Sequence, residues 1–151
     1  MSELVLRHGT WLLVCDGQRA LLFQNTGEYA RPRLESRETF RQDNPLSHAQ
    51  GSAPPGRVFA SGERRAATEE TDLHQQAAER FLGNVAKNVN RRVKKGEIQH
   101  LGIIAPARAM GTLRAQLSEQ VRAVLAGELV RDYAGMPVHE IELSLTRLVL
   151  H

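Results

Sequence analysis

Residues 72–105, DLHQQAAERFLGNVAKNVNRRVKKGEIQHLGIIA, decide how this chain folds. In their first part, apolar side chains recur every four residues, which is typical of one face of an α-helix. Asp72 is a candidate N-cap with Gln75 three residues later, and Gly96 is a candidate C-terminal stop. We therefore predict a helix of about twenty residues that buries one stripe. The stripe comprises Leu73, Ala77, Phe81, Val85, Val89 and Val93, with Ala78, Leu82 and Ala86 beside them.

The second part of the stretch, Gln99–Ala105 (QHLGIIA), is a nearly continuous apolar run that Pro106 stops. Such a run is typical of a strand that is buried on both faces. Because a helix precedes it, the crossover predicts that this central strand lies parallel to a neighbour.

Upstream, two apolar runs flank a turn sequence. Thr10–Cys15 (TWLLVC) is followed by Asp16-Gly17 and then by Arg19–Phe23 (RALLF), which predicts a β-hairpin. We expect the Asp-Gly pair to supply positive φ in the turn, and Asn25-Thr26-Gly27 to end the second strand for the same reason. The mixed alternation of Arg33–Phe40 predicts a third strand at the sheet edge.

Downstream of Pro106 the pattern predicts two more helices and one more strand. A helix is expected over Ala109–Leu117, with Met110, Leu113 and Leu117 facing inward, and a short strand over Glu128–Tyr133. Pro137 is well placed in the first turn of a terminal helix, whose apolar positions are Val138, Ile141, Leu145 and Leu148. The resulting order, β-β-β-α-β-α-β-α, predicts an α/β, ribonuclease-H-like fold with a mixed five-stranded sheet.

The whole chain, 1–151, is expected to form a single domain, because 151 residues with 41% apolar content can bury a core without a disulfide or metal. Cys15 is the single cysteine, which excludes a disulfide framework. Residues 41–72 contain few apolar side chains and three prolines, so we predict a long loop there, either functional or floppy. No stretch is apolar enough for a membrane span or a signal peptide, and we expect a cytoplasmic protein without membrane insertion.

Charge is unevenly distributed along the chain. Residues 73–126 carry nine Lys or Arg and three Glu, a net charge of +6 within a chain whose net charge is +3. On the predicted helix, Arg80, Lys87, Arg91 and Lys94 fall within a sector of about 60° beside the apolar stripe. This edge favours a nucleic acid or another polyanion as partner, and the alternative is a solvated helix face.

The sequence assembles no catalytic group. A nuclease of this fold would need three or four carboxylates to hold two magnesium ions. Asp16 and Glu79 could supply two of them, but the central strand ends in Ala105-Pro106-Ala107 without an acid. The six histidines are scattered, and phosphate-loop and nucleophile-elbow motifs are absent. We predict no catalytic residue, metal or cofactor, with a hydrolase of an ester or phosphodiester, using Asp16 and loop residues, as the alternative.

Several short motifs, taken together, resemble the bacterial host attachment family, described as proteins required for attachment to host cells. They are Trp11–Asp16 (WLLVCD) with Arg19-Ala20, Pro55–Gly62 (PGRVFASG), Phe81, Ala105-Pro106-Ala107 and Met110–Arg114 (MGTLR). That family looks like a bacterial relative of the central domain of archaeal and eukaryotic class I release factors. The resemblance implies a ribonuclease-H-like topology and contact with the ribosome.

The catalytic tripeptide of those release factors, Gly-Gly-Gln, does not occur in this sequence. We therefore expect a non-enzymatic cytoplasmic module that binds RNA or the ribosome, with an indirect role in host-cell attachment. Binding is assigned to the basic helix edge and to the Pro-Gly loop. The candidate binding residues are Gly56, Arg57, Arg80, Lys87, Arg91 and Lys94.

Overall fold

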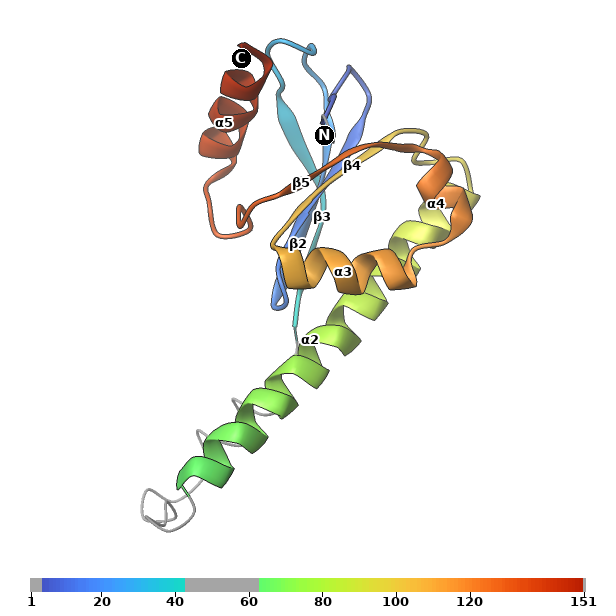
Figure 1. Cartoon of the computed structure of the whole chain (residues 1–151). Helices are drawn as coiled ribbons and strands as arrows, with labels where there is room; N and C mark the ends of the chain where they lie inside the picture. The colour runs from blue at the N-terminus through green and yellow to red at the C-terminus, as the bar shows by residue number, and fades with distance from the viewer. Residues whose placement is uncertain (1–3, 43–62, 151) are drawn as a thin grey trace.

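A mixed five-stranded sheet forms the centre of the computed structural model, which describes residues 4–42 and 63–150 (Figure 1). Its strands are β1 (Trp11–Cys15), β2 (Arg19–Asn25), β3 (Leu34–Arg41), β4 (Leu101–Ala105) and β5 (Leu125–Val130). The strand order is β3-β2-β1-β4-β5, with antiparallel pairing from β3 to β1 and parallel pairing from β1 to β5. The predicted α/β class, the hairpin, the edge position of β3 and the parallel central strand are confirmed.

Four helices are described: α2 (Glu63–Lys94), α3 (Ala107–Gln116), α4 (Glu119–Ala123) and α5 (Val138–Leu150). The short α4 is a separate helix, divided from α3 by Leu117 and Ser118. Ser118 is its N-cap, and the Ser118 hydroxyl accepts a hydrogen bond from the backbone N–H of Val121. Because α4 ends at Ala123, β5 starts at Leu125, three residues before the predicted Glu128.

Helix α2 begins nine residues before the predicted Asp72, so the N-cap assignment of Asp72 is wrong. Residues 63–72, ERRAATEETD, belong to the helix and not to the predicted loop, since most are good helix formers and none is Gly or Pro. This N-terminal part of α2 projects from the body, as Figure 1 shows. The other part of the predicted loop, from 43 to 62, lies outside the described residues, and the single-domain organisation stays a prediction.

The hairpin turn does not use positive φ, which among the described residues occurs only at Gly9, Gly96 and Gly127. The Asp16 carboxylate instead accepts hydrogen bonds from the backbone N–H groups of Gln18 and Arg19, at 2.8 and 2.9 Å. Gly17 is required for space, because a Cβ there would lie 2.9 Å from Cβ of Ala78 on α2. The predicted helix stop at Gly96, with φ of +81°, is confirmed.

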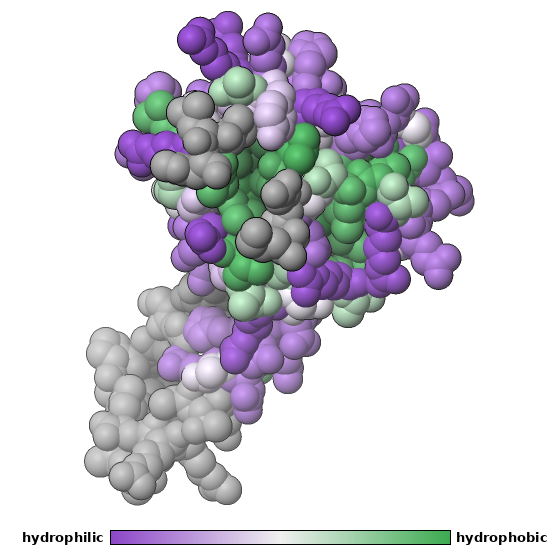
Figure 2. Space-filling model, turned by 45° about the horizontal axis from the view of Figure 1, so that its top comes forward, coloured by the Kyte–Doolittle hydropathy of each residue, from purple (hydrophilic) through white to green (hydrophobic). Residues whose placement is uncertain are grey.

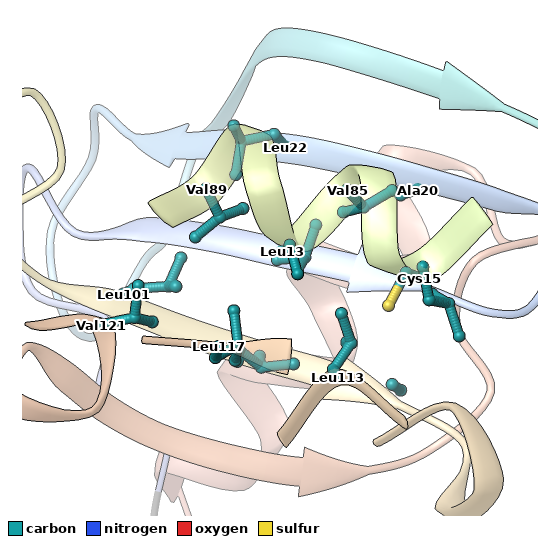
Figure 3. Packing of buried hydrophobic residues seen from close by; sticks show 14 of the residues in the cluster. Leu13, Cys15, Ala20, Leu22, Val85, Val89, Leu101, Leu113, Leu117 and Val121 are labelled. Atoms are coloured by element: carbon teal, nitrogen blue, oxygen red, sulfur yellow. The ribbon is translucent and has the colours of Figure 1, made fainter. Parts of the chain in front are cut away.

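The sheet is covered on both faces. Leu13 and Cys15 of β1 point toward α2, α3 and α4 and pack with side chains of these helices in the larger core (Figure 3). Trp11 belongs to the same core. Leu12 and Val14 point to the opposite face, where Ile141 and Leu145 of α5 cover them. Figure 2 shows apolar side chains gathered in the centre of the body on the visible face, and polar side chains around them.

The apolar positions that we predicted to face inward are buried on α3 and in the middle of α5. At the two ends of the predicted α5 stripe the prediction is wrong. Met110, Leu113 and Leu117 are buried, as are Ile141 and Leu145. Val138 and Leu148, at the two ends of the predicted α5 stripe, are instead 36% and 45% exposed. Among the described side chains of α5, the buried ones thus lie in its middle turns.

Candidate nucleic-acid interface

The inward face of α2 is defined by side chains that are at most 2% exposed: Leu82, Val85, Ala86 and Val89. A stripe with a spacing of four drifts by about 40° per step on a helix with 3.6 residues per turn. The predicted stripe is therefore in phase with the core at Val85 and Val89 but not at Leu73, which is 42% exposed.

The four predicted binding residues of α2 lie opposite this inward face. Arg80, Lys87, Arg91 and Lys94 are all exposed, and at about 100° per residue their mean direction is about 160° from that of the buried side chains. The sequence predicted that these four side chains lie beside the buried stripe. The structure instead places them in an outward row, which we call the basic face. Its length from Arg80 to Lys94 is about 21 Å at the rise of an α-helix.

The basic face contains no carboxylate to neutralise it. Residues 80–96 include six Lys or Arg and no Asp or Glu. One of the six, Arg92, lies on another side of the helix, where it pairs with Glu38 and Glu97 and lies 5.7 Å from the ring of Trp11. Within 4–42 and 63–150, the four basic-face side chains make no ion pair.

The tertiary structure thus divides the nine cations of residues 73–126 into two groups. Arg92, Arg108, Arg114 and Arg122 each make an intramolecular hydrogen bond, and Arg114 pairs with Glu128 at 2.8 Å, which raises the pKa of its guanidinium. The second group remains available to a partner. It consists of the basic face and Lys95, an exposed residue just beyond α2 that sequence reasoning left out although its charge was visible.

Gly56 and Arg57, the other two predicted binding residues, lie outside the described residues. Their expected role in the Pro-Gly loop stays a prediction.

The candidate catalytic groups are not assembled in the part of the chain that the structure describes. One Asp16 oxygen accepts two backbone hydrogen bonds in the hairpin turn, and the other lies 3.7 Å from Nε of Arg19, so the carboxylate has a structural role. Glu79 is exposed on α2. No three His, Cys, Asp or Glu side chains among the described residues lie close enough to hold a metal ion.

Cys15 is fully buried, and burial raises the pKa of its thiol to about 12, with a further contribution from the Asp16 charge. Because the thiolate is the reactive form, the native protein should not react with an aromatic disulfide reagent at pH 8. One thiol per chain should react after unfolding in urea. Rapid reaction of the native protein, followed by absorbance, would show that Cys15 is accessible.

Among the described helices, none is both long enough and apolar enough to cross a membrane.

The fold and the exposed basic face define an α/β domain with a cationic helix surface. This chain belongs to bacterial archaeo-eukaryotic release factor family 12, whose model matches residues 9–145. A solved structure similar to it is the crystal structure of an archaeal translation termination factor, aRF1, with 13% identity and a TM-score of 0.49. The match covers 93% of this chain but only 37% of that one. No curated protein matches this chain.

The family assignment confirms the release-factor part of the resemblance seen in the sequence. The host-attachment part receives no support from these comparisons.

Proposed function

We propose that this chain is a non-enzymatic module that binds RNA, with ribosomal RNA as its target, through the basic face of α2. The observation that carries the proposal is the row Arg80, Lys87, Arg91 and Lys94, exposed and without a carboxylate between residues 80 and 96. Cations arranged this way attract the phosphate backbone, whose neutralisation releases counterions. The release-factor family supports the ribosome as partner, and thereby the cytoplasm as compartment.

The side chains of the basic face favour double-helical RNA over a single strand. Binding of unpaired bases usually relies on aromatic side chains on which the bases stack. Phe81, the one Phe, Tyr or Trp of α2, is buried in the core at 8% exposure, and the exposed His74 lies six residues before the start of the basic face. The outward row therefore offers charged contacts to phosphates without an aromatic stacking surface, which suits a helical segment of a folded RNA.

RNA binding without catalysis is better supported for this chain than hydrolysis of an ester or phosphodiester. The chain lacks Gly-Gly-Gln, and Asp16, the candidate residue of the hydrolase alternative, is committed to the hairpin turn. Gly56 and Arg57 are kept in the proposal as a second contact.

Changing Arg80, Lys87, Arg91 and Lys94 together to Ala should weaken binding to a ribosomal RNA hairpin and flatten its salt dependence. Each lost phosphate contact should lower the slope of log K against log salt by about 0.7–0.9, so the slope should fall by about three units. Fluorescence anisotropy at several salt concentrations from about 50 mM upward measures this. The free energy of unfolding should change little, because exposed charges contribute little to stability.

A matched control is the variant in which Arg7, Arg31, Arg131 and Arg147, all exposed and none of them on α2, are changed to Ala. It removes the same charge, so it should lower the affinity slightly and keep most of the slope. Equal slopes in the two variants, or no binding of the wild-type protein at low salt, would assign the basic face to solvation alone. A single-stranded RNA of equal length should bind more weakly than the hairpin.

A further inference from the structure

Two arginines face each other across the edge of the sheet. In the antiparallel pairing of β2 with β3, Arg19 is directly opposite Arg41. Opposed residues of such a pair project to the same face, with their Cβ atoms about 5 Å apart. Like charges in that position are destabilising. The two arginines, with Gln18 and Gln42, line a hollow of about 290 Å³.

The backbone holds the two arginines in this arrangement. Gln42, which follows Arg41, makes two hydrogen bonds to the hairpin turn before β2. Its backbone N–H donates to the carbonyl of Gln18, and its side-chain amide donates to the carbonyl of Gly17. On the other side, the loop after β5 approaches the guanidinium of Arg19, where a Cβ on Gly135 would lie 3.5 Å from Nη2. The two strand backbones are therefore held together next to this arginine pair.

The charges at the hollow do not balance. The carboxylate that Arg19 contacts is that of Asp16, at 3.7 Å from Nε, and one Asp16 oxygen already accepts two backbone hydrogen bonds. Arg41 is exposed and makes no ion pair with the described residues. Among the described residues, Arg19 thus has one carboxylate partner and Arg41 has none, which leaves an excess positive charge at this pair.

We propose that Arg19 and Arg41 form a clamp for a phosphate group. A phosphate carries the opposite charge, and its oxygens accept paired N–H bonds from the planar guanidinium group. Bound between the two side chains, it replaces their repulsion by two charge-assisted contacts. The phosphate belongs either to a small molecule or to the 5′ end of an RNA, and the site is separate from the basic face of α2.

The test compares Arg41→Gln with the wild-type protein by thermal unfolding, in sodium phosphate and in sodium chloride of equal ionic strength. Phosphate should raise the Tm of the wild-type protein, because a ligand that binds only the folded state stabilises it. The variant should lose this rise, and in chloride it should unfold at the same temperature as the wild type or higher. In calorimetric titration its phosphate affinity should fall about tenfold or more.

Arg37→Gln is the matched control, since Arg37 is on the same strand but already pairs with Gln24 and Glu35. It should keep the phosphate response. Equal responses of wild type and Arg41→Gln, or a lower Tm of Arg41→Gln in chloride, would overturn the clamp.

Two further experiments distinguish the source of the phosphate and show whether the clamp acts independently of the basic face. Stronger binding of an RNA with a 5′-phosphate than of the same RNA with a 5′-hydroxyl, lost in Arg41→Gln, identifies an RNA end. A phosphate response without that difference identifies a small molecule. The variant that lacks the basic face should respond to phosphate as the wild type does, so the clamp can hold even if the RNA proposal fails.

Discussion

Changing Phe81 to Ala is expected to lower the free energy of unfolding by about 3–5 kcal/mol. Phe81 has the largest buried side chain of α2 among the described residues, is 8% exposed and belongs to the core between α2, α3 and the sheet. Its truncation removes apolar contacts and leaves a cavity that the helix cannot close, because neighbouring Val85 and Leu82 are already packed against the strands. Urea unfolding followed by circular dichroism measures the loss.

Leu73→Ala is the control for this experiment, because the four-residue spacing places both residues on one stripe while the structure separates them. Leu73 is 42% exposed, so its truncation should cost less than about 1 kcal/mol. A loss below about 1 kcal/mol for Phe81 would mean that the phase of α2 is wrong.

Asn25→Ala should lower the free energy of unfolding by about 3–5 kcal/mol, although the residue looks like an ordinary turn former. Its side chain is fully buried at the end of β2. The amide donates to the carbonyl of Leu6 at 2.8 Å, and the carbonyl oxygen accepts from the N–H groups of Gly27 and Arg33, both at 2.9 Å. Alanine would leave these three backbone groups without a partner. Each group that remains buried lowers the free energy of unfolding by about 1–3 kcal/mol.

Thr26→Ala is the matched control for Asn25, since the neighbouring hydroxyl makes one exposed, 3.3 Å hydrogen bond to the carbonyl of Arg33. It should cost less than about 1 kcal/mol. Equal unfolding midpoints for the two variants in urea would show that water replaces the Asn25 contacts.

Features that depend on local pattern could be predicted from the sequence. The order of strands and helices follows from changes between continuous apolar runs and helical spacing, and the parallel central strand follows from the helix that precedes it. The exposure of Arg80, Lys87, Arg91 and Lys94 was also predictable in kind, because charged side chains are rarely buried without partners. Their use by a partner is still a proposal.

Features that depend on which segments meet were decided only by the tertiary structure. The sheet decides which side of α2 is inward. Among the described side chains of α2, burial begins at Phe81, so Leu73 is exposed although the four-residue spacing puts both on one predicted stripe. Arg92 pairs with Glu38, which is 54 residues away in the sequence, so its charge is not available on the basic face. Arg19 lies opposite Arg41 because of the register in which β2 pairs with β3. A residue's neighbours along the chain determine its backbone preference, but burial and charge pairing depend on distances in space. Those distances exist only once the strands have paired and the helix has packed against them.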